Sequence, residues 1–221
     1  MSLTHKNGFT LIELLAGIVI VAILLSILIP VASNVLHSSR QVRCASNMRQ
    51  LFLAVQAYGQ EHNGQIIASL GGGPKPEGLG YWIWTDALQD YLEISGATPS
   101  NGNRPKGVLA CPGSEATVVG GARSDYAING HLSLGKSNER FQNLVDPAAT
   151  ICLIEGKNPS SNTCVREIAW WSSLEHMGIS FQHEGTANAV FFDGHVESLS
   201  SEQLPVGSAE SKRRPWAVNP L

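Results

Sequence analysis

The sequence predicts an α+β protein in which a long N-terminal helix packs on a small, loop-rich domain of antiparallel strands. Two observations carry this prediction: residues Phe9–Ile29 are almost uninterruptedly apolar, and the C-terminal half contains short β-type segments separated by turn residues. The chain has 221 residues, enough for one compact core with an extension. Its 22 glycines and 11 prolines indicate many loops within that core domain.

Composition argues against a nucleic-acid partner. Charged residues make up 15% of the chain, below the roughly 25% of an ordinary soluble domain, while hydrophobic residues make up 43%. The formal net charge is −3, and the basic cluster Lys212–Arg214 is too short to neutralise many phosphates. The apolar excess instead indicates that part of the chain faces lipid.

The apolar segment Phe9–Ile29 is long enough to cross a membrane. At about 1.5 Å per residue it gives a helix of roughly 31 Å, close to the thickness of a hydrocarbon core. A secretory signal peptide is the alternative, but its apolar region is shorter and ends in a small-residue cleavage site, and neither condition is met here. The residues that interrupt the segment are Thr10, Glu13, Gly17 and Ser26.

Glu13 is out of place in an apolar segment. Burying an ionised carboxylate in lipid costs roughly several kcal/mol unless the carboxylate is paired. Either it lies near enough to the interface to reach water, or it pairs with a cation. The residues around it, Gly8-Phe9-Thr10-Leu11-Ile12-Glu13 after a short polar leader, resemble the cleavage and methylation motif of type IV prepilins and type II secretion pseudopilins.

This resemblance implies a processing pathway. Prepilin peptidase would cut between Gly8 and Phe9 and methylate the new amine of Phe9, and Glu13 would pair with the terminal amine of a neighbouring subunit during assembly. Pro30 falls where many pilins carry a helix-kinking proline. The expected partners are therefore the peptidase, other pilin or pseudopilin subunits and inner-membrane lipid.

Topology also rests on the resemblance. The basic residues near the segment are Lys6 before it and Arg40, Arg43 and Arg49 after it, which is opposite to a simple positive-inside count. The resemblance implies a single pass through the bacterial inner membrane, with the leader cytoplasmic, the globular domain periplasmic and the protein assembled into a filament.

The helical pattern continues beyond the apolar segment, and Asn63-Gly64 predicts that it stops after about Gln60. We therefore divide the chain into a leader (1–8), a transmembrane and assembly helix (9–30), an amphipathic half-helix (31–62), a β domain (63–204) and a tail (205–221). The apolar stripe predicted to pack on the domain is Val42, Ala45, Met48, Phe52, Val55 and Tyr58.

The predicted strands form an antiparallel meander. Asp193-Gly194 predicts a hairpin with a type I′ turn, which needs positive φ at both central residues. The strand segments are Val108–Cys111, Asp125–Asn129, Thr150–Glu155, Cys164–Trp171, Gly178–Gln182, Ala189–Phe192 and His195–Leu199.

A second resemblance lies in this half. His183, nine intervening residues and then Asp193-Gly194-His195 resemble the C-terminal signature of the prepilin-type, processing-associated family of planctomycete and verrucomicrobial type. This resemblance implies architecture and an export route, and it names no ligand. Further pieces that look like that family are Cys44–Leu51, Cys111-Pro112, Asp125–Gly130 and Asp146-Pro147.

Catalysis finds no support in the sequence. His183, Asp193 and His195 are residue types used for metals and for acid–base work. If His183 lies opposite residue 188 in a hairpin, however, Asp193 is about 16 Å further along at about 3.3 Å per residue. We therefore interpret His183 as a strand-end residue and Asp193 as a turn residue. With no nucleophile motif and no dense oxygen cluster for calcium, we expect no enzyme activity, no cofactor and no metal.

The cysteines and tryptophans each leave alternatives open. Cys44, Cys111, Cys152 and Cys164 have no Cys-x-x-Cys spacing, so export would allow disulfides. We favour Cys152–Cys164 across a strand loop, which leaves Cys44–Cys111 to tie the helix to the domain; free buried thiols are the alternative. Four tryptophans either stack on a glycan or fill a small core, and they are Trp82, Trp84, Trp170 and Trp171.

Two functions follow. The first is a structural pilin-like subunit of a type II secretion pseudopilus or type IV pilus-like filament. The second is a membrane-anchored periplasmic binding module, for example for a glycan, that uses the leader only for delivery. Replacing Glu13 by Ala separates them, because only a filament subunit should lose assembly.

Overall fold

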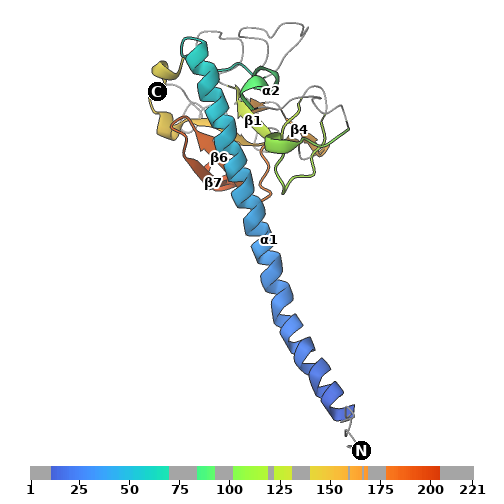
Figure 1. The fold of residues 1–221 in the computed structure, drawn as a ribbon. Helices are drawn as coiled ribbons and strands as arrows, with labels where there is room; N and C mark the ends of the chain where they lie inside the picture. Colours follow the sequence, from blue (N-terminus) through green and yellow to red (C-terminus); the bar gives the residue numbers. More distant parts are fainter. Residues whose placement is uncertain are drawn as a thin grey trace, which may run out of the picture. The chain divides into compact units, whose positions relative to one another are not determined.

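A computed structural model describes residues 11–69, 84–92, 102–118, 122–130, 140–158, 160–165, 167–168 and 178–204. The chain forms two compact units, Met1–Ser39 and Arg40–Leu221. The predicted α+β class is confirmed: a long N-terminal helix is followed by a small, mostly antiparallel sheet domain with loops (Figure 1). Gly8, Phe9, Trp82, Trp170, Trp171 and the tail 205–221 lie outside the described residues.

Helix α1 runs over Leu11–Glu61 and continues through Pro30. It ends where the sequence predicts, because Asn63 and Gly64 take the left-handed conformation with φ of 55° and 77°. The N–H of Gly64 donates to the carbonyl of Gly59 at 2.6 Å, which satisfies one of the last helical carbonyls. The C-terminal end of the helix thus lies within one residue of the predicted one.

The first unit contains the apolar part of α1. Residues Leu11–Ile29 form a helix long and apolar enough to cross a membrane, and none of this span is buried. Leu11 is 81% exposed and Ile29 is 68% exposed. The hydroxyl of Ser26 donates to the carbonyl of Ile23 at 2.7 Å, so this polar group is satisfied within the helix itself.

The second unit is built on a five-stranded sheet in the order β5-β1-β2-β6-β7, with β3 and β4 forming a separate hairpin. Neighbours are antiparallel except β1 and β5, which are parallel. The predicted meander is therefore wrong at this edge, because the chain crosses over to return beside β1. The strands are β1 Tyr126–Asn129, β2 Ile151–Glu155, β3 Lys157–Asn158, β4 Thr163–Cys164, β5 Glu167–Ile168, β6 Thr186–Phe191 and β7 Val196–Ser200.

Two predicted strands do not form as such. Gly107–Leu109 is a 3₁₀ helix, η2, and the segment 178–182 contributes a single bridge between Ile179 and Gly156. The other short helices are α2 Trp84–Ala87, η1 Asp90–Leu92, η3 Phe141–Asn143, η4 Pro147–Ala149 and η5 Ser201–Gln203.

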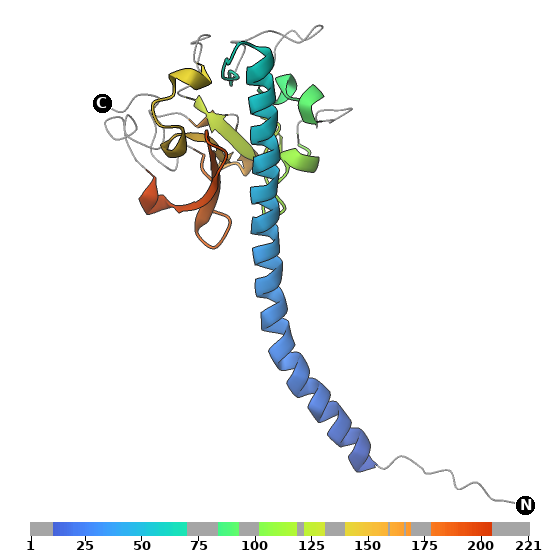
Figure 2. The ribbon, with the colours of Figure 1, turned by 60° about the vertical axis from the view of Figure 1, so that its left-hand side comes forward.

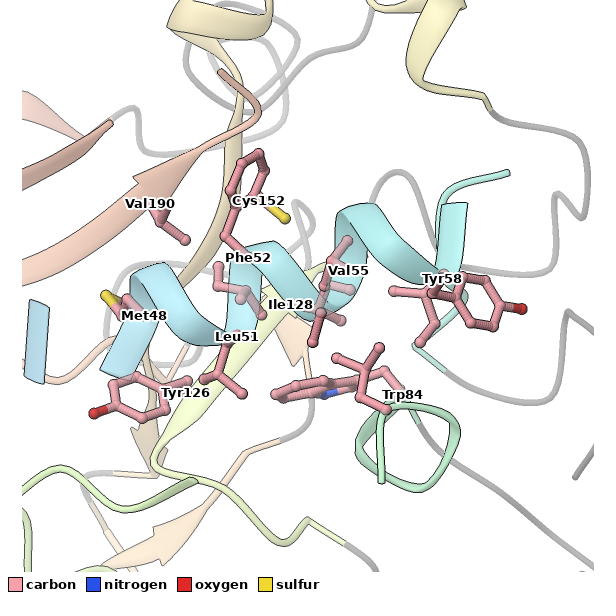
Figure 3. Close-up of a cluster of buried hydrophobic side chains, with 14 of the residues drawn as sticks. Met48, Leu51, Phe52, Val55, Tyr58, Trp84, Tyr126, Ile128, Cys152 and Val190 are labelled. Carbon is pink, nitrogen blue, oxygen red and sulfur yellow. The ribbon is translucent and has the colours of Figure 1, made fainter. Parts of the chain in front are cut away.

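The second half of α1 packs against β1, β2 and β6. Figure 1 shows α1 passing beside the labelled strands β1 and β6, and Figure 2 shows the same side of the domain turned by 60°. Figure 3 shows side chains of α1 directed toward Trp84 and toward residues of the strands. The predicted stripe is rotated at its start: Val42 is 69% exposed, whereas Cys44 and Leu51 are fully buried. The residues of α1 in this core are Cys44, Met48, Leu51, Phe52, Ala54, Val55 and Tyr58.

Strand β2 is buried on both faces, which is why it reads as a continuous apolar run. Cys152 and Leu153 belong to the cluster that contains α1, while Ile151 and Ile154 belong to a second cluster. A bulge between Ile151 and Leu153 shifts the register against β6. The strand ends at Glu155, which is fully buried.

Candidate functional site

The apolar half of α1 carries one ionisable side chain, Glu13, within Leu11–Ile29. Gly17 and Val21 follow it at intervals of four, so the three residues share one helix face. A Cβ added at Gly17 would meet no atom within 4 Å. This face therefore offers a carboxylate beside a position where a neighbouring helix could approach closely.

His183 occupies a tight turn. Its N–H and carbonyl pair with those of Thr186 at 3.2 and 2.9 Å, and the two central residues, Glu184 and Gly185, have φ of 52° and 84°. These are type I′ dihedrals, so His183 lies opposite residue 186 and not opposite residue 188 as the spacing had predicted. The turn places the buried imidazole at the start of β6, where its Nε2 lies 2.8 Å from Oε1 of Glu155.

Asp193 lies at the other end of β6, in the predicted hairpin. The turn type differs from type I′: the Gly194 N–H donates to the Phe191 carbonyl at 2.9 Å, and φ is positive at Gly194, at 92°, but not at Asp193. This is a three-residue loop whose last residue is left-handed. A Cβ at Gly194 would lie 2.9 Å from the Phe52 ring, so the turn also packs on α1.

Asp193 and His195 form a local, half-exposed pair. Asp193 Oδ1 accepts from the backbone N–H of His195 at 3.1 Å and lies 2.6 Å from its Nδ1. Partial burial opposes ionisation, but these hydrogen bonds outweigh it and hold the pKa of Asp193 below its usual value. His183 and Asp193 thus have separate partners.

Cys44 and Cys111 form a disulfide with a Cα–Cα distance of 5.1 Å. It joins α1 to the residues that follow η2. The favoured pairing of Cys152 with Cys164 is wrong, because both are free and buried.

The strand register explains this correction. The β3–β4 hairpin pairs Lys157 with Cys164, so Cys152 lies too far back along the chain to face it. Cys152 packs in the cluster around α1, and Cys164 packs with Ala116 and Ala122. Burial raises the pKa of both thiols, that of Cys164 to about 12.

The disulfide lies beside the pair formed by His183 and Glu155. Cys111 Sγ is 3.4 Å from His183 Nε2 and 3.6 Å from Glu155 Oε1. The potential ligand atoms of Cys44, Cys111, Glu155 and His183 all lie within 4.8 Å of one another, and all four residues are buried. Among the residues that the structure describes, this is the grouping with metal-ligand chemistry.

This cluster cannot be predicted from the sequence. Its members come from α1, the loop after η2, the end of β2 and the turn before β6, and the two cysteines alone are 67 residues apart. No short motif spans such separations. In the sequence Glu155 is only the last residue of a predicted strand, so its place in the cluster emerges from the tertiary structure.

Neighbouring groups fix the Glu155 carboxylate. The backbone N–H of Asn188 donates to Oε2 and its side-chain Nδ2 donates to Oε1, both at 3.1 Å. Asn188 Oδ1 in turn accepts from the Ser198 hydroxyl at 2.7 Å. Burial raises the pKa of Glu155, and the contacts with His183 and Asn188 oppose that rise.

Asp125 fixes the backbone of Cys111. Its Oδ2 accepts from the Cys111 N–H at 2.8 Å and its Oδ1 accepts from the Ser114 hydroxyl at 2.6 Å. Burial raises the pKa of Asp125 to about 6 even though these hydrogen bonds favour the carboxylate. The cluster therefore has a second layer of polar groups around it.

One of the four tryptophans considered for stacking on a glycan, Trp84, is not available at the surface. Trp84 has no exposed surface and lies in the core beside Leu51 and Val55 (Figure 3). A buried indole cannot stack on a sugar, so Trp84 belongs to the core. The other three tryptophans lie outside the described residues.

Comparison with known proteins identifies the N-terminal segment. Residues 3–29 match the family described as the prokaryotic N-terminal methylation motif. No curated protein and no solved structure matches the chain. The matched residues cover the leader and the apolar half of α1, so the comparison identifies a prepilin-type N-terminus and leaves the domain after it unassigned.

Proposed function

We propose that this chain, a protein with a prepilin-type methylation motif, is a structural subunit of a type II secretion pseudopilus or a type IV pilus-like filament. Prepilin peptidase would cleave it between Gly8 and Phe9 and methylate Phe9. The mature protein would sit in the inner membrane as a single-pass protein with its domain in the periplasm until it joins the filament.

The observation that carries this proposal is the combination of the motif with the surface of α1. The match to residues 3–29 coincides with Leu11–Ile29, whose apolar side chains are exposed on every side. Such a surface is stable only in lipid or against other apolar helices. The core of a filament would supply other apolar helices once the subunit has left the lipid.

Glu13 gives this packing a register. A carboxylate among apolar side chains is costly unless a cation meets it, and the terminal amine of a neighbouring subunit would supply that cation. Gly17, one turn along the same face, leaves room for the neighbour to approach. The charge pair would therefore select one axial position among many that hydrophobic contact alone would allow.

The domain has a structural role in this proposal, and we assign it no catalytic residue. One of its polar groupings, Asp193 with His195, is accounted for by the geometry of its turn. The domain would present its surface on the outside of the filament.

Processing is tested by the mass of the N-terminal peptide recovered from membranes of cells with active or inactive prepilin peptidase. We expect a terminus at Phe9 with one added methyl group in the first case and an intact Met1–Gly8 leader in the second. Cleavage well beyond Ile29, or an unprocessed terminus in both cases, would contradict the proposal.

Assembly is tested by replacing Glu13 with Gln, which keeps the size of the side chain and removes its charge. We expect normal membrane insertion and at least a tenfold loss of subunit–subunit cross-linking, roughly the effect of losing one charge pair. Ser26→Ala is the matched control, because the Ser26 hydroxyl is satisfied within its own helix. If Glu13→Gln leaves cross-linking unchanged, the chain is better described as a membrane-anchored binding module.

A further inference from the structure

The buried cluster of Cys44, Cys111, Glu155 and His183 poses a question that the filament function leaves open. A disulfide has no proton to donate and no charge, yet the Cys111 sulfur faces an imidazole at 3.4 Å and a carboxylate oxygen at 3.6 Å. Burying polar groups is costly unless each finds a suitable partner. The imidazole and the carboxylate bond each other at 2.8 Å and Asn188 donates to the carboxylate, so the disulfide sulfur adds a contact that neither group needs for its hydrogen bonding.

The four side chains make a donor set that suits zinc. Zn²⁺ takes cysteine, histidine and carboxylate ligands in a tetrahedron, with about 2.3 Å to sulfur and about 2.0–2.2 Å to nitrogen and oxygen. Those bond lengths place neighbouring ligand atoms roughly 3.3–3.8 Å apart. Two of the observed separations, 3.4 Å from sulfur to nitrogen and 3.6 Å from sulfur to oxygen, fall in this range.

The pair of ligand atoms that departs most from a tetrahedron is Cys44 Sγ and Cys111 Sγ, because these two sulfurs are covalently bonded. Once the bond is broken, the two sulfurs must separate to about 3.7 Å to bind one zinc. The 2.8 Å between His183 Nε2 and Glu155 Oε1 also has to lengthen by about half an ångström. Both changes are of the size that side-chain rotation supplies.

We propose that the cluster is a redox-gated metal site: with Cys44 and Cys111 reduced, Cys44, Cys111, Glu155 and His183 bind one zinc-type divalent cation, and the disulfide is the metal-free alternative. Either state ties α1 to the sheet domain.

The two states interconvert by a balanced exchange. In oxidation, the two thiolates lose two electrons in total to a disulfide-class oxidant, the Cys44–Cys111 bond forms and the metal ion leaves. The oxidant takes up the two electrons and two protons from solvent and becomes a dithiol. In the reverse direction, a dithiol reductant supplies the electrons, and the metal ion displaces the thiol protons.

Groups around the cluster already hold three of the ligands in place. Asn188 donates twice to Glu155, and the turn at Glu184-Gly185 fixes the backbone of His183. Asp125 accepts from the backbone of Cys111. Such outer groups orient ligands in metal sites, and their presence here means that the site needs little rearrangement beyond separating the sulfurs and slightly lengthening the distance from His183 to Glu155.

Of the four cluster residues, Cys111 lines a cavity of about 490 Å³. The lining of that cavity also includes Arg43, Asn47 and Arg104. Cys111 itself is fully buried, so exchange requires local opening. We therefore expect metal loading and release to be slow compared with a surface site.

The site is tested on the full chain in detergent micelles with Co²⁺ as the probe, because tetrahedral Co²⁺ bound to thiolates gives visible d–d bands and a near-ultraviolet charge-transfer band. After reduction under anaerobic conditions, we expect one Co²⁺ per chain with these bands, and displacement by Zn²⁺. The oxidised chain should give neither band.

Matched variants show which residues bind the ion. Glu155→Gln and His183→Gln should each weaken Co²⁺ binding by at least about tenfold. Asp193→Asn and His195→Gln are the controls, because Asp193 and His195 also form a carboxylate–imidazole pair but lie outside the cluster. Both variants should leave Co²⁺ binding unchanged. The double variant Cys152→Ser, Cys164→Ser removes the two free thiols and should also bind normally.

The oxidised protein separates loss of a ligand from loss of the fold. Because the disulfide state needs no metal, each variant's unfolding midpoint in the oxidised form reports whether its domain is intact. The proposal is overturned if the reduced chain gives no tetrahedral bands, if folded Glu155→Gln and His183→Gln bind as tightly as the parent, or if binding depends on Cys152 and Cys164.

Discussion

The two halves of α1 are both rich in apolar residues, yet they use them in different ways. In Leu11–Ile29 the apolar side chains surround the helix and are exposed, whereas from Cys44 onward the buried ones share a single face. Leu51 is fully buried and Leu53, two residues along, is 62% exposed. One continuous helix thus passes from a surface suited to lipid or to other helices to a surface suited to its own domain.

This difference teaches that helix formation and helix environment are decided separately. Both halves satisfy their backbone hydrogen bonds within the helix, so neither needs a particular neighbour in order to be helical. What differs is where the apolar surface is removed from water. The second half uses contacts within its own chain, and the first half depends on lipid or on other chains.

The largest expected effect concerns the two free thiols, Cys152 and Cys164, of the domain that packs on the second half of α1. The pKa of Cys164 is raised from 9.0 to about 12, so at pH 8 its thiolate population, and with it the rate of alkylation, should fall by about 1,000-fold. Cys152 should be at least as protected. A cysteine placed at Leu53 is the exposed control. Thiol titration should give no fast-reacting group in the folded parent and two after unfolding, and two fast thiols in the folded parent would contradict the structure.

The next largest effect is on domain stability. Leu51→Ala removes a fully buried side chain and should lower the free energy of unfolding by about 3 kcal/mol, because a cavity forms between α1 and the sheet. Leu53→Ala, on the exposed side of the same turn, should change it by less than about 0.5 kcal/mol. Urea unfolding of the full chain in micelles measures both values. Equal effects would mean that the buried face is wrongly assigned.

A smaller effect distinguishes backbone strain from contact with α1. Gly194→Ala should cost about 2–3 kcal/mol, because φ is 92° and the new Cβ would lie 2.9 Å from the Phe52 ring. Gly185→Ala has a similar φ of 84° but meets no atom within 4 Å, so it should cost only about 1–2 kcal/mol. The difference in unfolding free energy between the two variants reports the contact with α1 alone. No difference would argue that the hairpin does not pack on the helix.

The smallest effect is at the end of α1. The hydroxyl of Tyr91 donates to Oε2 of Glu61 at 2.5 Å, so Tyr91→Phe should cost about 1 kcal/mol or less. Burial, aided by the hydrogen bond to Glu61, raises the pKa of Tyr91 to about 12. A raised pKa favours the protonated folded form, so this contribution is full below pH 10 and is lost as pH rises toward 12. The unfolding midpoints of the parent protein and of the Tyr91→Phe variant should therefore converge as pH rises through this range.

Several features could be predicted because they depend on neighbours in the sequence. The length of α1 follows from apolar periodicity and from Asn63-Gly64, and the position of the hairpin follows from Asp193-Gly194. The turn type was missed because a two-residue and a three-residue loop share the same Gly signal. The disulfide pairing was missed because it depends on strand register, which sequence spacing around Cys152 and Cys164 does not fix.

The sequence by itself determined the membrane-length helix, its single carboxylate and the methylation motif. Each of these is a local pattern of neighbouring residues, so it can be interpreted without knowing the tertiary structure. Only the tertiary structure decided that Cys44, Cys111, Glu155 and His183 meet in one buried cluster. Such a cluster depends on the crossing of α1 over the sheet and on the bulge and turns that set register. These features involve residues that are far apart in the sequence, so they are set only when the whole core packs.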